Sequence, residues 1–205
     1  MKIITISREF GSGGRELGKR LADELNFRYY DREIIEKIAE DTSLDENYIE
    51  RTLENGVGAA VYPITFSRSF GYIAPVNTHY FEILASQQEV IKKLPEHGDC
   101  VIVGRSADSV LVEYNPFKVF VYSDMKSKLA RCRARADRHE EKLTDKQLLR
   151  RIKKLDKVRK QTHDMYSSTV WGDKITYNLC VNTSGASIKE LAKSLAEYVK
   201  TILKD

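Results

Sequence analysis

The sequence feature that most constrains the fold is a glycine-rich loop directly behind a short apolar run. The run IITI at residues 3–6 is typical of a buried strand, and Leu17, Leu21 and Leu25 form one face of a helix. Between them stands GSGG at residues 11–14. A strand that turns through glycines into a helix leaves several backbone N–H groups aimed at one point, at the positive end of the helix dipole. This order predicts a site for phosphate.

The same loop lacks the side chains that phosphate loops normally carry. A tight turn without a ligand is the alternative interpretation of the glycines, and the position behind the first strand favours phosphate. In the standard loop GxxxxGK[ST], the lysine neutralises phosphate and the hydroxyl binds Mg²⁺. Here Gly14 takes the lysine position and Arg15 the hydroxyl position. We expect Arg8 and Arg15 to replace the lysine, because a guanidinium binds phosphate through two parallel hydrogen bonds.

Short β-type runs alternate with longer helical segments along the whole chain of 205 residues. This alternation predicts a parallel α/β sheet within one domain, residues 1–205. The strands are expected at residues 2–6, 27–30, 100–103, 117–122 and 177–182. One predicted helical stripe runs through Phe81, Leu84, Gln88 and Ile91. Residues 55–78 mix Gly, Pro and aromatic residues without a clear period, which indicates a loop or lobe.

Helix starts are marked by a Ser or Thr followed three residues later by Glu or Gln. In such a capping box the two side chains satisfy each other's backbone N–H groups. The sequence predicts capping boxes that pair Ser43 with Glu46, Thr144 with Gln147, and Ser187 with Glu190.

Composition narrows the class of protein. The net charge of +4 hides a dense run of Arg and Lys at residues 126–160, which requires an anionic partner; nucleotide and nucleic acid would both qualify. No apolar stretch approaches the ~20 residues of a membrane span, so we expect no membrane anchor and a cytoplasmic location. The three cysteines lack metal-ligand spacing and read as reduced thiols.

Arginines in the basic run are spaced for a common anion. Arg131, Arg135 and Arg138 share one helical face, while Arg133 turns aside. A solvated basic face is the alternative interpretation. In the next helix, the apolar stripe of Leu148, Ile152 and Leu155 continues to Arg159. A charge on a buried face needs a partner, which would be either a phosphate or a carboxylate.

Five motifs, taken in order, resemble the cytidylate kinase-like family, a branch of the P-loop nucleoside monophosphate kinases. They read ITISREFGSGGRELGKRLADEL, YYDREIIEKIA, CVIVGRSADSVL, IKKLDKVRK and WGDKITYNLCVNTS. The resemblance implies a P-loop NTPase-type three-layer α/β fold with a five-stranded parallel sheet. It also implies a helical segment that binds the nucleoside monophosphate, at about 42–80, and an arginine-rich lid at about 126–160.

The resemblance implies transfer of the γ-phosphoryl group of ATP to CMP or a related monophosphate, with Mg²⁺ as cofactor and small nucleotides rather than nucleic acid as partners. The residues that would contact ATP phosphates are Arg8, Gly11, Ser12, Gly13, Gly14, Arg15 and Glu16. Those that would bind the monophosphate are Asp31, Arg32, Gln88, Arg105 and Asp108. The expected catalytic arginines are Arg15, Arg105, Arg131, Arg135 and Arg159.

The chain also departs from the family pattern. Val103 stands where such kinases place an aspartate before Gly-Arg, and Asp108 is the nearest carboxylate that could replace it. The metal ligands therefore stay unassigned. Two other functions remain open: a nucleotide-binding or sensing protein with impaired catalysis, and a phosphotransferase with a different acceptor. The sequence leaves the acceptor base, the sugar preference and the oligomeric state undetermined. His163, Tyr166 and Trp171 are not expected to be catalytic, because aromatic residues near a helix end more often close a core.

Overall fold

The computed structural model describes residues 1–56, 78–135 and 143–203. Its centre is a parallel five-stranded sheet in the order β2-β3-β1-β4-β5. The strands are β1 (Ile3–Arg8), β2 (Arg28–Tyr30), β3 (Cys100–Val103), β4 (Phe117–Tyr122) and β5 (Leu179–Asn182). The predicted five-stranded parallel sheet is confirmed. Strand β1 extends to Arg8, beyond its expected end, so Arg8 lies at the edge of the sheet where the loop begins.

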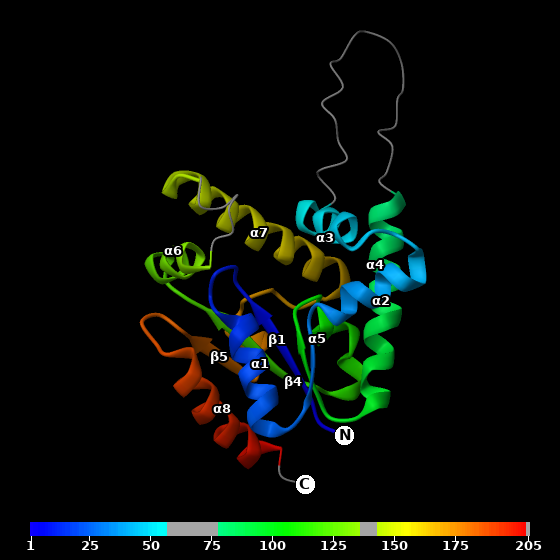
Figure 1. The fold of residues 1–205 in the computed structure, drawn as a ribbon. Helices are drawn as coiled ribbons and strands as arrows, with labels where there is room; N and C mark the ends of the chain where they lie inside the picture. The colour runs from blue at the N-terminus through cyan, green and yellow to red at the C-terminus, as the bar shows by residue number, and fades with distance from the viewer. Residues whose placement is uncertain (57–77, 136–142, 204–205) are drawn as a thin grey trace.

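Helices cover both faces of the sheet (Figure 1). They are α1 (Gly14–Leu25), α2 (Glu33–Thr42), α3 (Glu46–Asn55), α4 (Thr78–Lys93), α5 (Ala107–Val110), α6 (Met125–Ala134), α7 (Asp145–Tyr166) and α8 (Ile188–Ile202). Short 3₁₀ helices are η2 (Leu94–His97), η3 (Val112–Tyr114) and η5 (Lys174–Thr176).

Two apolar cores lie on opposite faces of the sheet. Successive side chains of a strand point to opposite faces, so Ile3 joins one core and its neighbour Ile4 joins the other. The first core packs α2, α3, α4 and α5 against the sheet, and the second packs α1 and α8. This gives a three-layer α/β fold, with helices on both faces of the sheet.

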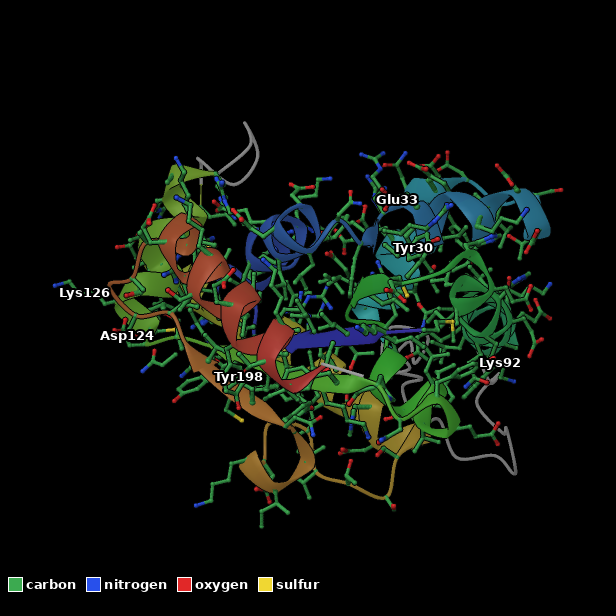
Figure 2. All side chains as sticks on the ribbon, turned by 90° about the horizontal axis from the view of Figure 1, so that it is seen from below. Tyr30, Glu33, Lys92, Asp124, Lys126 and Tyr198 are labelled. Carbon is green, nitrogen blue, oxygen red and sulfur yellow. The ribbon has the colours of Figure 1, made fainter. Side chains whose placement is uncertain are left out.

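Helices α6 and α7 lie beyond the carboxyl ends of the strands (Figure 1). A small cluster of Cys132, Leu148 and Ile152 joins them, with Phe10 of the loop after β1 packed against it. Figure 2 shows Asp124 and Lys126, at the start of α6, on the opposite side of the molecule from Lys92 of α4. The loop after β1 packs directly against these two helices, since Phe10 contacts their cluster and Gly11 lies against Cys132 of α6.

Two local predictions are wrong. Ser43 ends α2 in a left-handed conformation, and Asp45 caps α3 by accepting the Tyr48 N–H. Asp45 is the better-placed acceptor because its extended backbone aims the carboxylate at the first turn. The predicted stripe on α4 is wrong in part: Leu84 and Ile91 are buried as expected, but Phe81 is exposed and Gln88 is only partly buried. The capping box at Thr144 is confirmed, and Ser187 caps α8.

Two predictions lie outside the described residues, namely the lobe over most of residues 55–78 and the third lid arginine, Arg138. None of the helices in the described part combines the length and apolar character needed to cross a lipid bilayer. Cys100, Cys132 and Cys180 are free thiols.

Candidate active site

The glycine loop turns sharply from β1 into α1. Gly11 and Gly13 have φ angles of 75° and 83°, in the left-handed region that favours glycine. A Cβ atom on Gly14 would approach the Arg8 Cβ to 2.7 Å. One on Gly11 would lie 3.0 Å from the Cys132 Sγ of α6. A side chain at Gly14 would therefore displace Arg8, and one at Gly11 would crowd α6.

The backbone N–H groups at the start of α1 are available to a ligand. The first helical hydrogen bond runs from the Leu17 N–H to the Gly13 carbonyl. Among the described residues, no acceptor pairs with the N–H groups of Gly13, Gly14, Arg15 or Glu16. Gly11, Gly13 and Gly14 all line a cavity. The strand, loop and helix thus form the anion-binding geometry that the sequence indicated.

Two cavities meet at this edge of the sheet. We name the first the loop cavity, and its walls include the three loop glycines, Arg131 and Arg135. We name the second the inner cavity, and its walls include Gln87, Arg105 and His163. Both share one set of wall residues, which are Arg8, Arg15, Glu50, Glu54 and Arg159. The two cavities therefore form one continuous cleft whose junction carries three guanidinium groups.

Arg8 is the most confined of these guanidinium groups. Its side chain is 12% exposed, and a Cβ on Gly104 would lie 1.4 Å from the Arg8 Nη1. Burial lowers the pKa of Arg8, and the positive charge of Arg159 lowers it further. Asp31 lies 3.7 Å from Arg8 and 2.5 Å from Arg15, so one buried carboxylate orients both arginines. Glu50 and Glu54 also line this junction, so the three guanidinium groups face three carboxylates before any ligand binds.

Arg105 lies in a strained backbone segment behind β3. Gly104, Arg105 and Ser106 have φ angles of 74°, 59° and 53°, so three consecutive residues are left-handed. For residues other than glycine this conformation costs about 1 kcal/mol or more, and such strain concentrates at functional sites. Burial lowers the pKa of Arg105, and its Nε is buried without a hydrogen-bond partner among the described residues. This donor in the inner cavity is suited to an anionic oxygen.

The lid arginines approach the loop from α6 and α7. Arg159 donates to the Arg8 carbonyl at 3.1 Å and stacks over the Phe10 ring, 5.5 Å from its centroid. Arg131 donates to the Ser123 Oγ and the Thr183 carbonyl. Burial lowers the pKa of Arg131 and Arg159. These side chains are held in place before any ligand binds.

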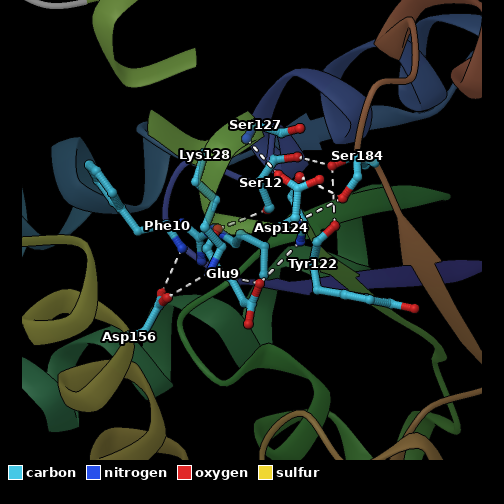
Figure 3. Close-up of polar contacts among 12 residues, drawn as sticks. Glu9, Phe10, Ser12, Tyr122, Asp124, Ser127, Lys128, Asp156 and Ser184 are labelled. Atoms are coloured by element: carbon cyan, nitrogen blue, oxygen red, sulfur yellow. Dashed lines mark hydrogen bonds and ion pairs between the residues drawn. The ribbon is translucent and has the colours of Figure 1, made fainter. Parts of the chain in front are cut away.

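A buried lysine connects the loop to the lid helices. The Lys128 Nζ lies 2.8 Å from the Glu9 carboxylate and 3.2 Å from the Asp156 carboxylate (Figure 3). Asp156 also accepts the Phe10 N–H at 2.6 Å. Burial raises the pKa of Asp156, although Phe10 and Lys128 both favour its charged form. The network links the loop after β1 to α6 and α7, so the loop and the lid are positioned together.

Several predicted site residues lie outside the walls of the cleft. Ser12 is fully buried and its hydroxyl donates to the Glu9 carbonyl at 2.8 Å. Glu16 forms ion pairs with Arg20 and with Arg135 of the lid. Arg32 is 76% exposed and pairs with glutamates in solvent.

Asp108 is buried next to His163 of the inner cavity, and Gln88 does not belong to the walls of that cavity. The structure brings together Arg8, Gly11, Gly13, Gly14, Arg15, Arg105, Arg131, Arg135 and Arg159.

The sequence did not single out three residues that line the cleft or support its walls. Gln87 replaces Gln88 because successive residues of a helix are rotated by about 100°, so the two neighbouring amides point in different directions. His163 continues the stripe of Leu155 and Arg159 by one more turn, so the pattern contained a signal for it. Lys128 had no signal, because a lysine within a basic run resembles its solvated neighbours.

The chain resembles known proteins along almost its whole length. The family model that matches is described as the cytidylate kinase-like family and spans residues 3–185. No curated protein matches the chain. An uncharacterized protein from Eubacterium ventriosum, solved by crystallography, is 26% identical, with 98% of this chain and 99% of that chain covered and a TM-score of 0.69.

Two kinases of known structure share the fold at low identity. Shikimate kinase from Acinetobacter baumannii is 12% identical, with 100% of this chain and 96% of that chain covered and a TM-score of 0.58. Deoxyadenosine kinase from M. mycoides is 9% identical, with 97% of this chain and 99% of that chain covered and a TM-score of 0.52. At these identities the likeness concerns the fold alone, which is that of P-loop kinases.

Proposed function

The chain belongs to the cytidylate kinase-like family, and we propose that it is a nucleoside monophosphate kinase that transfers the γ-phosphoryl group of ATP to CMP or dCMP. The observation that carries this proposal is the continuous cleft. Free loop amides lie at one end, the unpaired Arg105 Nε lies at the other, and Arg8, Arg15 and Arg159 lie at the junction. Two phosphate-bearing molecules that entered from the two ends would meet at the three arginines.

The proposed roles follow from where charge develops. The loop amides hold the ATP phosphates, and Arg105 with Arg8 orients the acceptor phosphate. In the transition state, negative charge spreads over the oxygens of the transferred group, and Arg15, Arg131 and Arg159 stabilise it. A monophosphate is ionised at neutral pH, so attack by its oxygen needs no strong base. Segments 42–80 and 126–160 are assigned as monophosphate-binding lobe and lid, and the proposed location is the cytoplasm.

The proposed cofactor is the Mg²⁺ that accompanies ATP. Mg²⁺ is usually held by one or two carboxylates together with substrate phosphates. Glu50 and Glu54 lie one turn apart on α3, line both cavities, and form no ion pair among the described residues. Ser12 is turned inward and Glu16 is already paired. Glu50 and Glu54 would therefore hold the ion, which would supply further positive charge to the transferred phosphoryl group.

A coupled assay of ADP release, run with CMP, dCMP, UMP and AMP, tests the proposal. We expect ADP release with CMP or dCMP at a rate well above the rate with UMP or AMP. Titration calorimetry with ATP is run on the same preparation. Binding of ATP without turnover of any monophosphate would instead support a nucleotide sensor, a function consistent with the missing loop lysine.

A further inference from the structure

A buried Asp-His pair stands beside the inner cavity, and the proposed kinase reaction does not use it. His163 of α7 lines the cavity with 1% of its side chain exposed. Its Nε2 lies 3.3 Å from the Oδ2 of Asp108 on α5, which is 2% exposed. Transfer to a phosphate oxygen needs no base, so the pair requires another explanation.

The contacts of Asp108 determine which nitrogen of His163 is free. The Asp108 Oδ1 accepts the Ser7 hydroxyl at 3.3 Å, so both carboxylate oxygens are engaged. A carboxylate can only accept, and the His163 Nε2 must therefore carry the proton in this contact. In the neutral form of the imidazole the lone pair lies on Nδ1, which has no hydrogen-bond partner among the described residues; the Asp164 Oδ1 is 3.8 Å away. The carboxylate thus orients the ring so that its neutral form can accept a proton at Nδ1.

Two other buried atoms without partners belong to walls of the same cavity. They are the Arg105 Nε, which is a donor, and the Gln87 Oε1, which is an acceptor. Buried polar groups are normally paired; these three atoms are closed off in the structure as it stands, so a ligand that pairs with them reaches them only as the side chains over them move aside. A matching ligand offers an anionic oxygen to Arg105 and hydroxyl protons to Gln87 and His163. This description fits a small alcohol that carries a phosphate or carboxylate group.

We infer that the cleft has a second activity, phosphoryl transfer from ATP to the hydroxyl group of a small anionic alcohol, with His163 as the general base. The ATP donor rests on the proposed function. The alcohol oxygen forms a bond to the γ-phosphorus as the bond to the β,γ-bridging oxygen breaks, and ADP leaves with that electron pair. The hydroxyl proton passes to the His163 Nδ1, and Asp108 stabilises the resulting imidazolium before the proton returns to solvent.

The experiment measures initial rates of ADP release with four acceptors. Glycerol 3-phosphate and D-glycerate carry the charge, glycerol lacks it, and CMP tests the proposed function separately. We expect ³¹P NMR to show a new phosphomonoester with a charged alcohol, formed at least ~10 times faster than with glycerol, because Arg105 binds the anionic group. The rates with glycerol 3-phosphate and with D-glycerate show whether the cavity prefers a phosphate or a carboxylate group.

Variants separate a proton acceptor from a merely structural residue. His163→Gln should lower the rate of transfer to the alcohol by about 10²–10⁴-fold. The rate of transfer to CMP should fall by a factor that is at least ~10 times smaller, because only the alcohol must lose a proton. Asp108→Asn should act in the same direction by disturbing the tautomer of His163. His97→Gln, on an exposed histidine of η2, is the matched control. Circular dichroism confirms that the variants fold.

Three outcomes overturn the inference. The first is that no alcohol is phosphorylated faster than ATP is hydrolysed. The second is that both variants keep the full rate of transfer to the alcohol. The third is that the variants lower the rates of transfer to CMP and to the alcohol equally. Turnover of CMP without any alcohol refutes the inference and leaves the proposed function standing. Turnover of an alcohol without CMP supports the inference and refutes the proposed acceptor.

Discussion

Arg105 combines a left-handed backbone with a buried guanidinium whose Nε has no partner among the described residues. Both features cost free energy in the absence of a ligand. An anion at this position would recover part of that cost, because the charge-assisted hydrogen bond is made in a buried site. At the scale of single residues, the inner cavity is therefore prepared for an anionic group.

Replacing Arg105 by methionine tests this role with little change of volume. We expect Arg105→Met to raise the KM for the monophosphate by about 100-fold, equivalent to ~2.7 kcal/mol, with a much smaller change in the Kd for ATP. Steady-state kinetics and ATP calorimetry measure the two quantities. Lys37→Met, an exposed lysine paired with Glu40 and Asp41 on α2, serves as the control. An equal rise of both constants would contradict a role at the acceptor end.

Gly104 and Gly185 form a matched pair for testing the position of Arg8. Both have positive φ angles, 74° and 65°, so alanine is strained at either position. Only at Gly104 would the new Cβ meet the Arg8 guanidinium; at Gly185 no atom lies within 4 Å. We expect Gly185→Ala to lower the free energy of unfolding by about 1 kcal/mol and Gly104→Ala by more, with weaker ATP binding in addition. Urea unfolding measures the free energies and calorimetry measures the affinity for ATP. Equal effects of the two substitutions would show that Arg8 moves aside at no cost.

At the scale of elements, Lys128 is the contact that joins the lid to the loop. Removing one partner of a buried ion pair leaves an uncompensated charge, and here two carboxylates would lose their cation. Lys128→Met should therefore lower the free energy of unfolding by about 3–5 kcal/mol. Urea unfolding is the measurement, and Lys126→Met, on the exposed face of the same helix, is the control. A cost for K128M no larger than that for K126M would contradict the role of the network.

The start of α3 provides a second test at this scale. Asp45 accepts the Tyr48 N–H at 3.1 Å, whereas Ser43 belongs to the end of α2. Asp45→Ala should cost about 1 kcal/mol of unfolding free energy, and Ser43→Ala only a few tenths, because only the first removes a cap. Chemical denaturation measures both. The reverse order would restore Ser43 as the cap.

At the scale of the whole molecule, the cleft brings together arginines that are far apart in the sequence. Arg8, Arg15 and Arg159 line its junction, with Arg131, Arg135 and Arg105 farther along the walls. Like charges at close range repel one another, and a multivalent anion relieves this repulsion. The folded protein should therefore bind phosphate chains more tightly than the unfolded chain does.

This expectation can be measured as a thermal shift. Pyrophosphate at about 100 times its Kd should stabilise the protein by ~2.7 kcal/mol, which raises the Tm by roughly 5–10 °C for a chain of this size. Sodium chloride at the same ionic strength is the control, because general screening of charge does not require a specific site. An equal rise in both salts would show that the cleft does not bind the anion specifically.

The sequence alone determined the five strands, the glycine loop and the positions of the arginines, because each depends on local periodicity or on a motif read along the chain. The tertiary structure decided which of these side chains meet. Arg8 lies against Gly104, Lys128 lies between Glu9 and Asp156, and His163 contacts Asp108, 55 residues away.

Such contacts could not be predicted because they depend on the order of the strands and on the rotation of each helix about its axis. A shift of one residue turns a helical side chain by about 100°, which is why Gln87 and not Gln88 lines the cavity. Local patterns specify which elements form. The packing of the two apolar cores fixes how these elements are rotated, and only that rotation places the charged groups around one cleft.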